Sequence, residues 1–226
     1  MFEYYYNNVP NEGLCRNNLV YTTTIDRSNN LFCVHYVVDQ IYHNNECLDE
    51  SALKEKWKRE IKFFTKFSSA FPEHTLPIHE IDDYNQKIIF KIQNNDFWQL
   101  AECNQENYNK VLPDWQEQML EILSAYRRCG IWKYSLHPSS YFVIDGKLKS
   151  INHFLCFKNN EPEISILEVL NIISDNRKAK LFEYLKANKI DHNQKFPFNF
   201  YGQVALDSFR SNYPSEFIDK AKQIYI

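Results

Sequence analysis

The sequence predicts an α+β protein in two parts, a strand-rich first part carrying one helix and a mostly helical second part. Runs of β-branched and aromatic residues separated by polar turns fill residues 1–95, a pattern typical of antiparallel strands. Apolar residues at helical spacing recur through residues 96–226, which favours helices there. With 226 residues, 44% of them hydrophobic, the chain is long enough to bury a sizeable core. The connection at 94–96 is the expected boundary.

A β-hairpin is the first predicted element. Residues 18–25 (NLVYTTTI) and 31–38 (LFCVHYVV) are rich in β-branched and aromatic side chains, and residues 26–30 between them are polar. This pattern predicts two strands joined by a turn. The tyrosines at 4–6 are interpreted either as an edge strand or as a partner-binding patch, because tyrosine is common at interfaces.

A helix and a second strand pair are predicted next. Residues 49–68 carry apolar side chains at helical spacing, with Asp49 available as the N-cap. Pro72 ends the helix, since proline has no backbone amide to continue it. The strand pair is expected at 77–81 and 87–92.

One hairpin interrupts the predicted helices of the second part. Residues 113–129 are amphipathic and are followed by Gly130, a residue common just after a helix end. Asp145 and Gly146 separate two strand-like runs, which predicts a hairpin near 141–151. Further helices are expected at 164–174, 178–187, 203–210 and 214–224.

Composition and charge narrow the class of protein. The net charge of −3 and isoelectric point of about 6.2 disfavour a protein that wraps nucleic acid. Apolar runs fall short of the roughly 20 residues that a membrane helix needs, and the opening residues lack a signal-peptide pattern. The abundance of Asn, Ile and Lys is typical of an AT-rich coding sequence, as in some viruses. We therefore expect a cytoplasmic protein, in the host cytoplasm for a viral source.

The cysteines and glycines disfavour two kinds of site. The six cysteines are scattered and form no C-x-x-C pair, so we expect free thiols and no metal site. Only four glycines are present, which leaves little room for phosphate-cradling loops.

Several segments, in order, resemble the protein kinase family. Residues 13–20 are similar to the glycine-rich loop G-x-G-x-x-G-x-V, and His35 follows at the position of the lysine on the third strand. Glu60 matches the glutamate of the family's first helix. Residues 88–97 resemble the strand that leads into the hinge, with Phe90 at the bulky gatekeeper position.

The resemblance continues into the second part. Residues 130–140 are similar to the catalytic loop G-I-x-H-R-D-L-K-P-x-N, and residues 150–154 fall where the D-F-G motif would lie. The match covers about residues 10–155. It implies one bilobal, kinase-like unit, with a small β-rich lobe at 1–95 and a shortened, mostly helical lobe at 96–226.

The residues that depart from the kinase pattern imply that phosphoryl transfer is lost. Transfer needs a lysine on the phosphates, carboxylates on magnesium and a base for the acceptor hydroxyl. Those positions and two more of the catalytic loop are altered, and Glu60 is the principal polar position that still matches. The altered positions hold His35, Ser135, His137, Ser140 and Asn152. Residues 155–163 are also too short for a kinase activation segment.

A nucleotide site is the second implication of the resemblance. If the site is retained, its residues are Gly13, Val20, His35, Phe90 and Asn152. Because Asn152 replaces a metal-binding aspartate, no cofactor is expected, and any ATP would bind without magnesium.

The resulting hypothesis is a pseudokinase without enzyme activity, which binds another protein as a scaffold, decoy or regulator. The oligomeric state stays open. One alternative is an atypical kinase or nucleotidyl transferase that uses His35, Glu60, His137 and Asn152 in rearranged roles. Another is a structural or assembly protein whose cleft is filled by its own aromatic side chains, of which 17 are Phe and 15 are Tyr.

Overall fold

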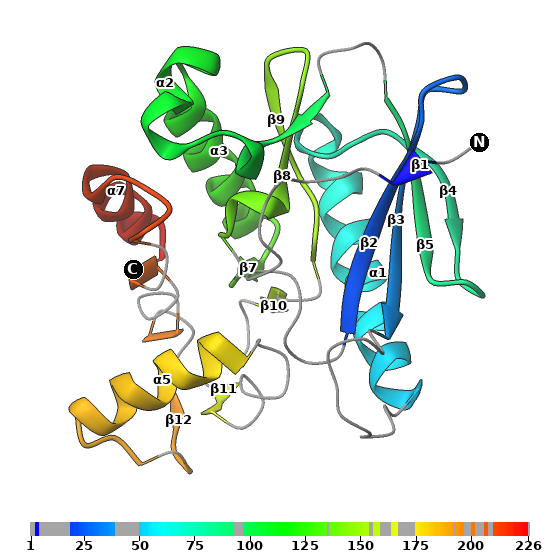
Figure 1. The fold of residues 1–226 in the computed structure, drawn as a ribbon. Coiled ribbons are helices and arrows are strands. Elements are labelled where there is room, and N and C mark those ends of the chain that lie inside the picture. Colours follow the sequence, from blue (N-terminus) through cyan, green and yellow to red (C-terminus); the bar gives the residue numbers. More distant parts are fainter. Residues whose placement is uncertain are drawn as a thin grey trace.

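A computed structural model was obtained for the chain, and its elements are drawn in Figure 1. It describes residues 3–4, 19–38, 50–92, 97–134, 136–153, 156–158, 164–166, 175–191, 193–196, 200–201, 206–207 and 210–225. The predicted α+β class is confirmed. The predicted boundary at 94–96 lies outside the described residues.

The first part contains an antiparallel five-stranded sheet in the order β1-β2-β3-β5-β4. The predicted hairpin and the predicted second strand pair are both confirmed, and the hairpin pairs Leu19 with Val38 through Asp26 with Leu31. Tyr4 lies in the edge strand, whereas Tyr5 and Tyr6 lie outside the described residues. The strands are β1 (Glu3–Tyr4), β2 (Leu19–Asp26), β3 (Leu31–Val38), β4 (Ile78–Asp82) and β5 (Lys87–Lys91).

The predicted helix of the first part is α1 (Glu50–Ala70), which follows β3 in the chain. It is amphipathic: Trp57, Phe63, Phe64 and Phe67 are buried, while Lys54, Lys58, Lys62 and Lys66 are exposed. Pro72 begins the short 3-10 helix η2 (Pro72–His74), as expected for a residue that cannot continue α1. Figure 1 shows α1 running beside the sheet, between it and the part that holds α3.

The second part is built on α3 (Trp115–Arg128) and the hairpin of β8 (Tyr141–Ile144) and β9 (Lys147–Ser150). Asp145 and Gly146 both have positive φ, 49° and 69°, as a tight hairpin turn requires. Gly130 after α3 has φ 69°, so the predicted glycine at the helix end is confirmed.

Smaller elements complete the second part, several of which the sequence did not predict. Strand β6 extends the β8–β9 hairpin to three strands, and β10 pairs antiparallel with β7. These short strands depend on distant partners rather than on a local pattern. The elements are β6 (Trp98–Gln99), η3 (Leu100–Glu102), η4 (Gln105–Asn107), α2 (Tyr108–Val111), β7 (Ile131–Lys133), η5 (Pro138–Ser140), β10 (Cys156–Lys158), β11 (Ile164–Ser165), α5 (Asp175–Ala187), β12 (Lys195–Phe196) and α7 (Ser215–Tyr225).

The helix predicted at 164–174 is wrong at its start. Ile164 and Ser165 form strand β11, which pairs antiparallel with Phe196 and Lys195 of β12. The pairing with a segment far along the chain overrides the local helical spacing. Residues 167–174 lie outside the described residues, as does most of the helix predicted at 203–210. The helices predicted at 178–187 and 214–224 are confirmed as α5 and α7.

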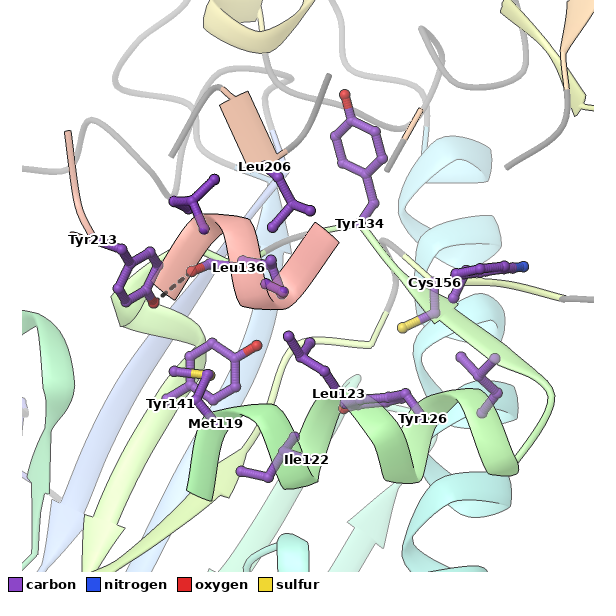
Figure 2. Packing of buried hydrophobic residues seen from close by; sticks show 14 of the residues in the cluster. Met119, Ile122, Leu123, Tyr126, Tyr134, Leu136, Tyr141, Cys156, Leu206 and Tyr213 are labelled. Atoms are coloured by element: carbon purple, nitrogen blue, oxygen red, sulfur yellow. Dashed lines mark hydrogen bonds between the residues drawn. The ribbon is translucent and has the colours of Figure 1, made fainter. Parts of the chain in front are cut away.

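Two hydrophobic clusters form the core, and α1 contributes to both. Trp57 and Phe64 pack with the sheet, whereas Phe63 and Phe67 pack with α3 and α7. In the cluster that contains Phe63 and Phe67, the hydroxyl of Tyr213 donates to the backbone oxygen of Leu136 over 2.6 Å (Figure 2). The two parts of the chain are therefore joined through one helix as well as through the backbone.

Among the described residues, none of the helices combines the length and the apolar character that crossing a bilayer requires.

Candidate functional site

A cluster of buried polar side chains lies where the middle of α1 meets α3, β7 and the residues after β9. We call it the buried polar cluster. Each member is at most 1% exposed, which is unusual for residues that carry charge. Its members are Glu60, Tyr126, Lys133, Ser150 and His153.

Helix spacing explains how two of these side chains become buried. Glu60 follows Trp57 by three residues and precedes Phe64 by four, so it lies on the apolar face of α1. Tyr126 follows Leu123 by three residues and Ile122 by four, so it lies with them on the inward face of α3. Each polar group is carried inward by its apolar neighbours and must find its partners inside the protein.

Glu60 and His153 are held together by two contacts. The Glu60 carboxylate accepts the backbone N–H of His153 over 2.5 Å, and its other oxygen lies 3.2 Å from His153 Nδ1. One residue from the first part of the chain thereby binds both the backbone and the side chain of a residue in the second part.

The contacts of His153 continue through Tyr126 to Ser150. His153 Nε2 lies 2.8 Å from the Tyr126 hydroxyl, which lies 2.9 Å from Ser150 Oγ. Burial lowers the pKa of His153, although Glu60 opposes this effect, and burial raises the pKa of Tyr126 well above its usual value. We therefore assign a neutral imidazole that donates a hydrogen bond from Nδ1 to Glu60 and accepts a hydrogen bond from the Tyr126 hydroxyl at Nε2.

Lys133 places a buried cation beside this chain of hydrogen bonds. Its ammonium group donates to the backbone oxygens of Ile151 and Asn152 over 2.9 and 2.7 Å. Lys133 and Glu60 both influence the pKa values of His153 and Cys156, in opposite directions. Glu60 and Lys133 thus place an acidic and a basic side chain in the same buried region.

In its described conformation the cluster is suited to holding the structure together rather than to reacting with a substrate. A carboxylate, an imidazole and two hydroxyls in series are the components of a proton relay. Here every member is enclosed, so a substrate would need the surrounding packing to open before reaching any of them. The hydrogen bonds join α1, α3 and the residues around β9.

Asn152 and Ser140 adjoin the cluster. Asn152 Nδ2 lies 3.4 Å from Ser140 Oγ, and the backbone N–H of Ile151 donates to the Ser140 oxygen over 2.9 Å. Asn152 has φ 69°, a conformation that asparagine tolerates better than most residues. Its Oδ1 is buried and has no hydrogen-bond partner among the described residues. The backbone conformation is one physical reason for asparagine at this position.

His137 has a local structural role. Its side chain caps η5, accepting the backbone N–H of Ser139 at Nδ1 over 3.2 Å and lying 2.7 Å from Ser139 Oγ. This fixes the turn that leads into β8. Ser135, at the predicted base position, lies outside the described residues.

His35 does not join Glu60. It lies on β3 next to Tyr36, whose ring packs against Trp57 of α1 with centroids 5.6 Å apart and an interplanar angle of 59°. Successive residues of a strand point to opposite faces, so His35 points away from α1. Burial, followed by the nearby Lys87, lowers its pKa. The structure therefore brings Glu60 close to Asn152 and Ser140 and leaves His35 on the other face of the sheet.

Phenylalanine rings pack between the sheet and the β8–β9 hairpin. Phe32 lies 4.8 Å from Phe97 and 4.9 Å from Phe142, and Phe97 and Phe142 stack at 4.9 Å with an interplanar angle of 10°. Phe90, the predicted gatekeeper, contacts Phe32 and Phe64. We call Phe32, Phe64, Phe90, Phe97 and Phe142 the phenylalanine cluster; each ring is at most 6% exposed.

The remaining predicted nucleotide contacts are described only in part. Val20 pairs with Val37 between β2 and β3, and Gly13 lies outside the described residues. Within the described ranges, no group of three or more His, Cys, Asp or Glu side chains is placed to hold a metal ion.

Four members of the buried polar cluster were not predicted as site residues: Tyr126, Lys133, Ser150 and His153. A lysine in the apolar run Ile131–Tyr134 was the available signal for Lys133, because lysine is rarely placed among core residues without a partner. Tyr126 and His153 had no comparable signal, since either side chain also fits an ordinary core position.

Comparison with known proteins does not extend this description: neither the protein-family models nor the curated proteins contain a match to this chain.

Proposed function

We propose that this chain is a kinase-like protein that has lost phosphoryl transfer and acts by binding a partner protein. The order of elements supports the kinase-like part of the proposal. Along the chain, three strands are followed by a helix and then by two further strands. The five strands form one sheet in the order β1-β2-β3-β5-β4, and a helical part with one hairpin follows. This is the layout that the sequence resemblance implies.

The observation that carries the loss of catalysis is the position of Glu60. In protein kinases the matching glutamate forms an ion pair with the lysine of the third strand, which contacts the phosphates. The carboxylate of Glu60 is instead enclosed and bound to His153 over 2.5 and 3.2 Å. The one principal polar position that matches the kinase pattern is therefore engaged in an internal structural contact.

The phenylalanine cluster supports a closely related candidate function, a structural or assembly protein with a filled nucleotide region. Phe90 occupies the predicted gatekeeper position, and Phe142 follows Ser140 of the catalytic-loop match by two residues. Their rings and those of their neighbours pack against one another where the resemblance would place a nucleotide. Both candidate functions are non-catalytic, and they differ in whether a nucleotide still binds.

The test is calorimetric titration of the purified protein with ATP, in magnesium and again in EDTA, together with a phosphotransfer assay. The expected result is no magnesium-dependent binding and no transfer. ATP binding that needs no magnesium would favour a nucleotide-regulated binding protein and would contradict a filled nucleotide region, whereas no binding would leave partner binding or assembly as the function.

One result would overturn the non-catalytic proposal. It is phosphotransfer that disappears in Asn152→Ala but persists in the matched control Asn193→Ala, which changes an exposed asparagine of a turn.

A further inference from the structure

The outward face of α1 carries a row of lysines. Lys54, Lys58, Lys62 and Lys66 follow one another at intervals of four residues, and all four are exposed. We call this row the basic stripe. Four residues of an α-helix advance about 6 Å and return almost to the same side. From Lys54 to Lys66 the stripe extends about 18 Å along the axis and winds about 120° around the helix, because each step of four residues turns about 40° past a full turn.

The stripe continues at the end of α3. Lys66 Nζ lies 3.4 Å from the point where a Cβ on Gly130 would stand, so the last lysine lies beside the turn that ends α3. In that turn Arg128 is exposed, and its guanidinium lies 5.0 Å from the ring centre of Phe71. The positive surface thus extends beyond α1 to a second helix.

Two acidic residues, Glu55 and Glu60, lie between residues 54 and 70 of α1. Glu55 lies 2.7 Å from Lys58, with both side chains 71% exposed. An ion pair so exposed to water is weak and gives way easily to another partner. The other acid between residues 54 and 70 is Glu60, which is buried against His153. The face that α1 presents to solvent is therefore strongly positive.

We propose that the basic stripe is the docking surface for an acidic segment of a partner protein. The inference rests on the proposed partner-binding function and names the chemistry of the partner. Glutamates at intervals of four along a partner helix would repeat the spacing of the lysines. The charge of the whole chain is −3, so the stripe also orients an approaching acidic partner toward one face.

The structure favours an acidic protein over nucleic acid as the occupant. Proteins that bind single strands pair their cations with aromatic rings on which the bases stack. The aromatic side chains that the structure describes on α1 are Trp57, Phe63, Phe64 and Phe67, and all are buried on the opposite face.

The experiment measures binding of a fluorescein-labelled decaglutamate peptide to the full chain by fluorescence anisotropy, at about 50 and 200 mM salt. The test variant combines Lys58→Gln, Lys62→Gln and Lys66→Gln. The matched control combines Lys91→Gln, Lys110→Gln and Lys186→Gln, which removes the same charge from exposed lysines elsewhere. Glutamine keeps a good helix propensity, and circular dichroism checks that both variants fold.

The expected result is salt-sensitive binding by the wild type and the control, with Kd raised about tenfold or more in the test variant, because three exposed charge contacts are lost together. Absence of binding, or an equal loss in the control, would overturn the proposal. Tighter binding of a ten-residue oligothymidylate than of decaglutamate would also overturn it, in favour of a nucleic-acid surface. None of these outcomes involves ATP, so the stripe can fail while the proposed loss of catalysis stands.

Discussion

The Glu60–His153 contact determines how each of its two residues should respond to change. A buried charge is tolerated when it is paired and hydrogen-bonded, and becomes costly when one partner is removed. Glu60 is 1% exposed, accepts from His153 and lies in the same buried region as the Lys133 cation. A substitution that keeps the size of Glu60 but removes its carboxylate should therefore still destabilise the protein, because the charge and both accepting oxygens are lost.

Replacing Glu60 should strongly destabilise the protein. Glu60→Ala removes the carboxylate that accepts from the backbone and imidazole N–H groups of His153, which should cost about 3–5 kcal/mol of unfolding free energy. Urea denaturation measures this value. Glu55→Ala, on the exposed face of the same helix, is the control and should leave the urea midpoint nearly unchanged. Equal stability of the two variants would contradict the assigned contact.

His153 should make stability depend on pH. Its folded pKa is lowered below the ordinary value of 6.5, mainly by burial. Between the folded pKa and about 6.5 the unfolded chain binds more protons, so stability is present above about 6.5 and falls as pH decreases through that window. One group contributes a slope of at most about 1.4 kcal/mol per pH unit.

The measurement is the urea midpoint between about pH 7.5 and 5.5, in wild type and in His153→Gln. The variant should show a smaller fall in stability. His35 and His74 also have lowered pKa values from burial, so part of the slope will persist. The control is His79→Gln at an exposed position of β4, which should keep the wild-type slope. A slope unchanged by His153→Gln would show that this imidazole does not titrate as described.

At the scale of elements, the sequence predicted best where a local pattern determines the structure. The hairpin of β2 and β3, the helix α1 and the turn at Asp145-Gly146 each combine an apolar period with a capping or turn residue. Ile164 and Ser165 were assigned to a helix because their strand partner, β12, lies some thirty residues further along the chain and is invisible to local spacing.

The candidate site was predicted only where a residue type stood out in its position. Glu60 was identified through the resemblance, but its partner His153 was not, because the sequence gives no distance between residues far apart in the chain. Asn152 and Ser140 were identified and do lie together. His35 was grouped with them by the resemblance, whereas the alternation of side chains along β3 turns it to the other face of the sheet.

The packing of α1 against α3 yields the third prediction. Phe67 is fully buried, and its ring stacks on Tyr126 at 3.7 Å with an interplanar angle of 7°. Phe67→Ala would leave a cavity and should cost about 3–5 kcal/mol of unfolding free energy. Thermal or urea denaturation measures the change. Phe182→Ala on α5, where the ring is 47% exposed, is the control and should have little effect; a similar cost for both would contradict the packing.

At the scale of the whole molecule, the sharing of α1 between the two hydrophobic clusters indicates that the two parts unfold together. Trp57 and Phe64 belong to the cluster of the sheet, whereas Phe63 and Phe67 belong to the cluster around α3 and α7. The buried polar cluster adds hydrogen bonds across the same junction. Unfolding of either hydrophobic cluster should therefore destabilise α1 and, through α1, the other cluster.

Hydrogen exchange tests this coupling. Ile88→Ala, at a 1% exposed position of β5, should lower the unfolding free energy by about 2–5 kcal/mol. If the molecule is one cooperative unit, the slowest amides of α3 and α7 should lose as much protection as those of β3 and β5. The control is Ile78→Ala on β4, where the side chain is 42% exposed and little change is expected. Unchanged protection in α3 and α7 would show two independent units. A cooperative molecule would instead let a partner bound on the α1 stripe stabilise the sheet and the helical part together, because α1 belongs to both.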